Sequence, residues 1–258
     1  MKYCQGLYPI IRKENPAAGV YDLSILCPEI AAIAKCGQFV NIRIDGFTLR
    51  RPISICEIDR QKGTLRIVFQ IRGKGTKAMA ELSPGGFIDM VAPLGGRGFT
   101  LQEGAQAIII GGGIGNPPML ELAKFYGENA IVISGFRNAA AVILQEDFKG
   151  TGAKTFLCTD DGTAGEKGFV TDILKRELQT HTPDIICACG PMPMLRGIAA
   201  IAKEKGIRSE VSLEERMGCG VGGCLVCACR TVKDGEGIFA HVCKDGPVFD
   251  SKEVFSNE

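Results

Sequence analysis

Four cysteines near the end of the chain constrain its fold more than any other feature. They follow the pattern Cys219-x4-Cys224-x2-Cys227-x15-Cys243. A spacing of four and then two residues, with a distant fourth cysteine, is the plant-type arrangement that binds a 2Fe–2S cluster. Such a cluster needs two thiolates for each iron. The segment must therefore form a loop wide enough to pass around the bridging sulfides.

Glycines fill this loop at positions 220, 222 and 223. Without a Cβ atom the backbone can approach closely and direct its N–H groups at the sulfides. A structural zinc is the alternative, but zinc sites usually combine paired Cys-x2-Cys elements, and only one is present here. Cys229 is a fifth cysteine in the segment, which we interpret as a packed thiol rather than a ligand.

Length and composition indicate a globular protein of two domains with a small appendage. The chain has 258 residues, of which 45% are hydrophobic and 23% charged, and its net charge of +1 provides no basic surface for nucleic acid. No apolar run reaches the roughly 18 residues of a membrane span. Twelve cysteines without a visible secretory signal favour reduced thiols. We therefore expect a cytoplasmic protein with no nucleic-acid or membrane partner.

Residues 1–99 have the pattern of an all-β domain. Short alternating runs occur at 38–44, 65–71 and 87–91, separated by Gly, Pro and Asp. Strands at this spacing are typical of an antiparallel barrel or sandwich. One helix is predicted over 76–82, with Thr76 as its N-cap.

From about residue 100 the pattern changes to alternating strands and helices. Apolar strand-like runs at 107–110, 130–134, 154–159 and 184–188 are each followed by a helical run, at 117–126, before Phe148, at 170–178 and at 193–205. Such a βαβα series predicts a parallel sheet with helices on both faces. We expect domains at 1–99 and 100–210, followed by a cluster-binding segment at 211–258.

A glycine-rich turn joins the first strand of this series to a helix that opens with proline. It consists of Gly111, Gly112, Gly113, Ile114 and Gly115. Glycines let a pyrophosphate approach the backbone, and a helix N-terminus favours its charge. The turn predicts a nucleotide site, although a tight turn without a ligand gives the same pattern.

The turn departs from the standard dinucleotide fingerprint. The next strand ends in Arg137 instead of a ribose-binding acid. We interpret Arg137 as a solvated surface residue; a contact with a 2′-phosphate is the alternative. The fourth strand ends in Cys187 and Cys189, on the same face by strand alternation, followed by Gly-Pro. We expect Cys189, at the mouth of the sheet, to be the more exposed thiol.

The order of these motifs carries a family resemblance. A β-rich half with Arg-Pro-x-Ser at 51–54 and Gly-x-Gly-Thr at 73–76, then an α/β half with the glycine turn and Cys-Gly-Pro at 189–191, resembles the ferredoxin–NADP reductase superfamily. Residues 212–224, 159–162 and 167–170 are further similar to the electron-transfer subunits of dihydroorotate dehydrogenase B. This resemblance covers essentially the whole chain and implies an N-terminal antiparallel β-barrel, a Rossmann-like domain and a small 2Fe–2S segment.

The resemblance also implies roles for single residues. FAD would be held at its pyrophosphate by Arg51, Gly75 and Thr76, and at its isoalloxazine by Pro52, Ile53, Ser54, Val68, Phe69 and Gln70. NAD would lie on the turn at 111–115, with Cys189 beside the nicotinamide as the catalytic residue. The four cysteines Cys219, Cys224, Cys227 and Cys243 would ligate the cluster. The superfamily has Tyr where Ile53 stands, so a stacking tyrosine is not available.

The implied activity is that of an electron-transfer subunit in pyrimidine biosynthesis. Electrons from the FMN of a separate dihydroorotate dehydrogenase catalytic subunit would pass through the cluster and FAD to NAD⁺, in a heterotetramer with two copies of each subunit. The chain shows no eight-fold βα repeat, so it is not itself the barrel subunit. Two alternatives stay open: an NAD(P)H–ferredoxin oxidoreductase or sulfhydrogenase-type subunit, and a nucleotide sensor stabilised by zinc.

Overall fold

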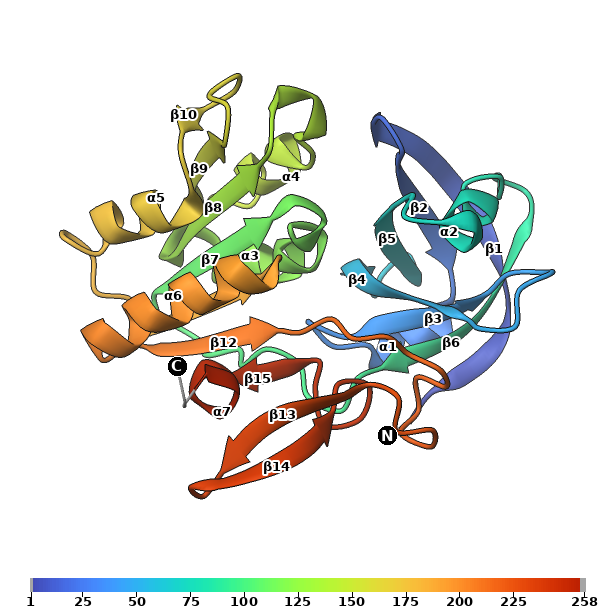
Figure 1. Ribbon diagram of the computed structural model, residues 1–258. Coiled ribbons are helices and arrows are strands. Elements are labelled where there is room, and N and C mark those ends of the chain that lie inside the picture. Colours follow the sequence, from blue (N-terminus) through green and yellow to red (C-terminus); the bar gives the residue numbers. More distant parts are fainter. Residues whose placement is uncertain (1, 256–258) are drawn as a thin grey trace. The chain divides into compact units, whose positions relative to one another are not determined.

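The computed structural model describes residues 2–255, which form two compact units (Figure 1). The first unit contains residues 2–98 together with Glu214–Cys229 and Phe239–Pro247. The second contains Phe99–Leu213, Arg230–Ile238 and residues 248–255. The residues after Leu213 are thus divided between the two units.

The first unit is a closed antiparallel β-barrel, which confirms the expected fold. In the order in which they pair, its strands are β1 (Cys4–Ala17), β2 (Val20–Leu26), β5 (Thr64–Gln70), β4 (Arg51–Asp59), β3 (Phe39–Arg43) and β6 (Phe87–Leu94). Alternate side chains fill the barrel, and Phe69 and Met79 are among the largest that are fully buried. Two short helices accompany the strands: α1 (Pro28–Ile33) and α2 (Lys74–Met79).

Helix α2 begins earlier than predicted. Its N-cap is Gly73, in an extended conformation, so the assignment of Thr76 as N-cap was wrong. Thr76 is the third helical residue, and its Oγ1 accepts hydrogen bonds from the backbone N–H groups of Arg72 at 2.8 Å and Gly73 at 3.1 Å. The hydroxyl therefore reaches back over the helix start, where glycine is an acceptable cap.

The second unit contains a seven-stranded sheet, predominantly parallel as predicted. Its order is β10 (Glu166–Lys167), β9 (Lys154–Thr159), β8 (Ala130–Phe136), β7 (Ala107–Gly112), β11 (Ile185–Cys189), β12 (Arg208–Ser212) and β15 (Val248–Asp250). Only β15 is antiparallel among these described strands. β7 is buried throughout, as expected for a central strand covered on both faces.

Helices cover both faces of this sheet. Figure 1 shows α5 (Val170–Glu177) and α6 (Met192–Lys205) on one face and α3 (Leu120–Tyr126) and α4 (Gln145–Lys149) on the other. Short 3₁₀ turns occupy the connections, at Gly113–Gly115, Pro117–Met119, Gly127–Asn129 and Ala139–Ala141. The proline-opened helix predicted over 117–126 is therefore a 3₁₀ turn that continues into α3.

The C-terminal segment contributes a hairpin and two elements that were not predicted. Strands β13 (Ala228–Lys233) and β14 (Glu236–His241) form the hairpin, and β15 is followed by α7 (Ser251–Phe255). β15 pairs with β12, so the chain returns to the parallel sheet after the last clustered cysteine. None of the helices within residues 2–255 is long and apolar enough to span a bilayer.

Candidate functional site

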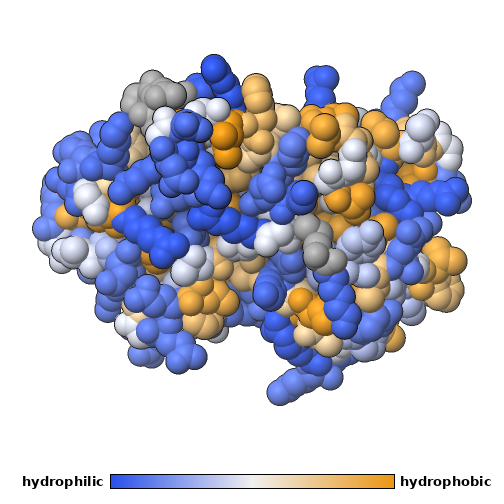
Figure 2. Space-filling model, turned by 90° about the horizontal axis from the view of Figure 1, so that it is seen from below, coloured by the Kyte–Doolittle hydropathy of each residue, from blue (hydrophilic) through white to orange (hydrophobic). Residues whose placement is uncertain are grey.

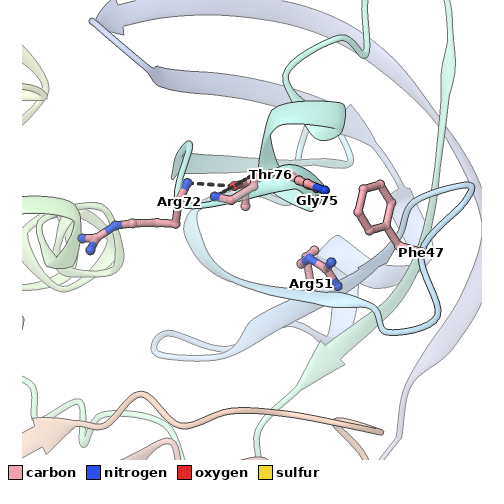
Figure 3. Close-up of a pocket in the computed structure, with 7 residues that line it drawn as sticks. Phe47, Arg51, Arg72, Gly75 and Thr76 are labelled. Atoms are coloured by element: carbon pink, nitrogen blue, oxygen red, sulfur yellow. Dashed lines mark hydrogen bonds between the residues drawn. The ribbon is translucent and has the colours of Figure 1, made fainter.

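A cavity of about 300 Å³ opens on the barrel unit where α2 begins (Figure 3). Arg51, the first residue of β4, and Phe47 line it together with the turn at 72–76. The backbone N–H groups in the first turn of a helix have no partner within the helix, and they carry partial positive charge. A guanidinium beside such N–H groups is suited to binding phosphate.

Gly75 allows this arrangement. A Cβ atom at position 75 would lie 2.2 Å from Arg51 Nε, so a side chain here would displace the guanidinium. Arg51 also lies over the ring of Phe47, with 5.2 Å between its Cζ and the ring centroid, and donates to the carbonyl of Leu49. Figure 3 shows the Arg72 side chain pointing away from Arg51. The cavity therefore has the donors that the pyrophosphate of FAD requires.

The expected flavin-lining residues lie on neighbouring strands. Pro52, Ile53 and Ser54 belong to β4 and are half-buried, and β4 pairs with β5, which carries residues 68–70. Phe69 is only 1% exposed, and its ring stacks on Tyr21 with 5.8 Å between centroids. The Phe69 ring is therefore part of the barrel core, and a contact of Phe69 with flavin requires its backbone.

The four clustered cysteines form two pairs. The backbone N–H of Cys219 donates to Cys224 Sγ at 3.3 Å, and the Sγ atoms of Cys227 and Cys243 lie 3.2 Å apart. Among residues 2–255, no three His, Cys, Asp or Glu side chains converge on one point. Two pairs of thiols match two irons with two thiolates each, whereas a tetrahedral zinc needs all four around one centre.

Backbone donors surround the sulfur of Cys219. It accepts N–H groups from Val221 at 3.4 Å, Gly223 at 3.2 Å and Cys224 at 3.4 Å. Burial alone raises the pKa of this thiol, but these N–H groups outweigh it and lower the pKa to about 6. The loop thus stabilises negative charge on Cys219, as a ligand thiolate requires.

The pKa values of Cys243 and Cys229 are shifted in the opposite direction to that of Cys219. Burial and the contact with Cys227 raise the pKa of Cys243 to about 12. Burial also raises the pKa of Cys229 to about 11. Cys229 belongs to neither close pair, which agrees with its interpretation as a packed thiol.

The barrel contributes a residue to this loop that sequence analysis did not identify. Asn41 of β3 is 1% exposed, and its Nδ2 donates to the carbonyl oxygen of Cys219 at 3.1 Å. The two residues are 178 positions apart. An asparagine inside a strand pattern gives no sign of such a distant contact.

The glycine turn of the second unit lies at the carboxyl end of β7. A Cβ atom on Gly112 would lie 2.6 Å from Met194 Sδ, and one on Gly115 would lie 2.3 Å from the carbonyl oxygen of Cys189. The turn is therefore packed against the end of β11 and the start of α6. Its glycines serve this close packing as well as access for a nucleotide.

Asn116 ends this turn and was also missed. Its Nδ2 donates to the carbonyl of Gly113 at 3.0 Å, and its Oδ1 has no partner among the described residues. A Cβ atom on Gly111 would lie 2.4 Å from Asn116 Oδ1. The only sign in the sequence that Asn116 has a role in the turn was that it departs from the standard glycine pattern.

Cys189, which we expected to be the more exposed thiol of the pair Cys187 and Cys189, is itself buried. Its side chain is 2% exposed, almost as little as that of Cys187 at 0%. The backbone of Gly115 packs directly on Cys189 and covers the end of β11. A thiol at a strand end is accessible only where the following loop leaves it open.

Carboxylates at this edge of the sheet come from the loop after β9. Arg137 is exposed after β8, as interpreted from the sequence. Asp161 accepts the hydroxyl of Thr163 at 2.6 Å, and Thr163 Oγ1 in turn accepts the N–H of Ala139 at 2.8 Å. Hydrogen bonds from Thr163 lower the pKa of Asp161. No acid follows β8, but the loop after the neighbouring strand β9 holds the carboxylate of Asp161 in a fixed position.

Curated proteins similar to this chain include electron transfer subunits of dihydroorotate dehydrogenase B. The family described as the iron-sulfur cluster binding domain of dihydroorotate dehydrogenase B matches residues 214–255. The "Dihydroorotate dehydrogenase B (NAD(+)), electron transfer subunit" of Bacillus caldolyticus is 40% identical over 247 residues, covering 92% of this chain and 93% of the relative. Its counterpart in Geobacillus thermodenitrificans is 39% identical over 254 residues, covering 95% and 96%.

Solved structures agree with the fold. The NADH-dependent reduced ferredoxin-NADP oxidoreductase structure has a TM-score of 0.86 and 31% identity, covering 96% of this chain and 90% of that one. The cytochrome b5 reductase domain of Ulva prolifera nitrate reductase has a TM-score of 0.64 over 81% of this chain and 96% of its own. At 17% identity, this second similarity shows the fold alone.

Proposed function

The chain belongs to the family of dihydroorotate dehydrogenase B electron transfer subunits, and on that premise we propose that it passes electrons from a dihydroorotate-oxidising partner to NAD⁺. The electrons travel through a 2Fe–2S cluster and FAD. The observation that carries this proposal is the arrangement of four cysteines in two pairs. Their segment contacts the barrel through Asn41, and the same barrel contains the cavity at the start of α2. The activity makes the chain an oxidoreductase subunit of pyrimidine biosynthesis.

The cluster is assigned to Cys219, Cys224, Cys227 and Cys243. A 2Fe–2S centre carries one electron at a time when bound. The chain supplies the thiolates and the N–H groups of Val221, Gly223 and Cys224, which offset the negative charge that the thiolates concentrate in the loop. The arrangement of the four cysteines in two pairs favours the cluster over the zinc alternative.

FAD is assigned to the barrel unit. Arg51, Gly75 and Thr76 bind its pyrophosphate in the cavity at the start of α2. Its isoalloxazine lies against β4 and β5, at Pro52, Ile53, Ser54, Val68, Phe69 and Gln70. When bound, FAD exchanges hydride with NAD and single electrons with the cluster. The barrel thereby connects two-electron and one-electron chemistry.

NAD is assigned to the glycine turn of the second unit, at Gly111, Gly112, Gly113, Ile114 and Gly115. The turn follows a buried central strand, the place where sheets of this kind bind nucleotides. Cys189 is proposed to lie beside the nicotinamide; because its thiol is buried, a contact with the ring requires the turn to shift. We assign the functional segments to 1–99 for FAD, 100–210 for NAD and 211–258 for the cluster.

The partner is proposed to be an FMN-containing catalytic subunit, in a cytoplasmic heterotetramer with two copies of each chain. Exposed apolar side chains gather in the cluster segment: Val221, Leu225, Val226 and Phe239 are 39%, 59%, 57% and 69% exposed. Figure 2 shows hydrophobic patches among hydrophilic side chains on the face seen from below. Such patches indicate a protein-binding surface.

Reconstitution tests this function. The purified chain is mixed with a dihydroorotate-oxidising barrel subunit under anaerobic conditions, and NADH formation is followed by absorbance. We expect NADH to form only when dihydroorotate and both subunits are present. The 31% identity to a reduced ferredoxin-NADP oxidoreductase favours ferredoxin as the second candidate partner. If ferredoxin supports turnover while dihydroorotate does not, the second candidate function is correct.

A further inference from the structure

Asn41 of β3 contacts the cluster loop from inside the barrel wall, and its polar side chain is buried. Its side chain is 1% exposed, its Nδ2 donates to the Cys219 carbonyl, and its Oδ1 has no partner among the described residues. The unpaired Oδ1 costs stability and the bond from Nδ2 to the Cys219 carbonyl offsets that cost, so the amide adds little net stability to the fold. The main effect of the amide is therefore to hold the cluster loop at the Cys219 carbonyl.

The loop is shaped to receive this amide. Gly220 follows the bonded carbonyl with a φ of +75°, and a Cβ atom on it would lie 2.5 Å from Asn41 Nδ2. Only glycine combines this backbone conformation with such a close approach. The Cys219–Gly220 peptide thus packs directly on β3.

The backbone of Asn41 is fixed from the other side. Its register partner on β4 is Pro52, which has no N–H to donate. The carbonyl oxygen of Asn41 instead accepts Arg50 Nη1 at 3.3 Å, and Arg50 is held by Asp89 at 2.8 Å. Asn41 is therefore held on one side by the cluster loop and on the other by the strand proposed to line the flavin.

We infer that Asn41 is a positioning residue for electron transfer between the flavin and the cluster. This inference rests on the proposed function. In the reverse direction, which NADH can drive in an experiment, bound FAD would accept two electrons as hydride and a bound cluster would accept them singly. Asn41 ties the Cys219 end of the cluster loop to β3, at the position that pairs with Pro52 of β4. It thereby holds the Cys219 end of the cluster loop in a constant position relative to the strands proposed to line the flavin.

The main test is Asn41→Leu in the full chain with its cofactors. We expect unchanged FAD, iron and sulfide content, an unfolding temperature close to that of the original chain, and an altered electron paramagnetic resonance spectrum of the reduced cluster. Cluster reduction after rapid mixing with NADH should slow about tenfold, the scale set by one hydrogen bond. Asn41→Asp, which keeps the shape and removes the donor, serves if the leucine variant loses its cluster.

Two matched controls separate positioning from general damage. Gln38→Met removes another buried barrel amide, one that donates to Gly95 and accepts from Lys35, and should leave the spectrum and rate unchanged. Gly220→Ala should reproduce the Asn41→Leu effect. Gly235→Ala should not, because Gly235 has a similar φ of +84° but nothing within 4 Å of an added Cβ.

The outcomes distinguish this inference from the proposed function. If the original chain holds no cluster, or its cluster is not reduced by NADH, the proposed function fails. If the original cluster is reduced while Asn41→Leu and Asn41→Asp show the same spectrum and rate, the inference is overturned. A lower unfolding temperature with an unchanged spectrum also overturns it, because Asn41 then serves stability alone.

Discussion

At the scale of single residues, the cluster assignment depends on the sulfur of Cys219. Replacing it by serine in Cys219→Ser removes a thiolate that three N–H groups surround. We expect loss of iron and sulfide with FAD retained, because the cluster and flavin residues lie in different segments. Metal, sulfide and flavin analysis of the purified variant measures this. Cys229→Ser is the control and should keep both cofactors; retention of the cluster in Cys219→Ser contradicts the ligand assignment.

The flavin assignment depends on Gly75. In Gly75→Ala, the new methyl group would meet the flexible Arg51 side chain, so the fold should persist while the guanidinium moves. Losing one charge-assisted hydrogen bond should weaken FAD binding about tenfold to a hundredfold. Gly237→Ala is the control, since an added Cβ meets nothing within 4 Å there and Gly237 does not line the cavity. Equal FAD affinity in both variants, measured by fluorescence titration, argues against a pyrophosphate at Arg51.

Residue roles were predicted from the sequence where spacing carries the chemistry. The cysteine spacing selected Cys219, Cys224, Cys227 and Cys243 without saying which of them pair; in the structure Cys219 contacts Cys224 and Cys227 contacts Cys243. Asn41 and the burial of Cys189 could not be predicted. Both depend on which loop packs over which strand, and this is set by contacts between residues far apart in the chain.

At the scale of elements, strands with a continuous apolar run were the most predictable. β9 has its predicted bounds, and β7 ends two residues beyond its predicted end. A continuous apolar run is buried on both faces of a parallel sheet, so its position in the sequence marks the strand directly. The start of α2 was misplaced because a glycine cap gives a weaker signal than a threonine. β15 has three residues, too few to show any periodicity.

β15 nevertheless contributes to stability. Val248 is fully buried and pairs with Ser212 of β12. We expect Val248→Ala to lower the free energy of unfolding by about 2 kcal/mol through lost burial and a residual cavity. Val226→Ala, at a side chain 57% exposed, should change it by less than about 0.5 kcal/mol. Denaturant unfolding measures both, and equal losses would show that β15 is not part of the core.

At the scale of the whole molecule, the order of motifs predicted the barrel and the parallel sheet. The residues after Leu213 behave differently from a third independent domain, since they are divided between the two units. A glycine- and cysteine-rich stretch has no hydrophobic periodicity, so its partners in the fold could not be derived from its pattern. The sequence predicts its chemistry better than its packing.

Partner binding is a property of the assembled molecule. Phe239, 69% exposed on β14, is the largest apolar side chain that we assign to the docking surface. Phe239→Ser should weaken association with the catalytic subunit about tenfold or more while both cofactors remain. Phe169→Ser, at a side chain 63% exposed in the second unit, is the control. Equal affinities by calorimetry would place the docking surface elsewhere.

Electron passage through a cluster and a flavin within one chain is the central claim. Its most direct measurement is anaerobic titration of the purified chain with NADH, followed by optical and electron paramagnetic resonance spectroscopy. We predict FAD together with two irons and two sulfides per chain, the composition of a 2Fe–2S centre, and reduction of both centres by NADH. A chain that contains zinc without acid-labile sulfide, or a cluster that NADH cannot reduce, would contradict it.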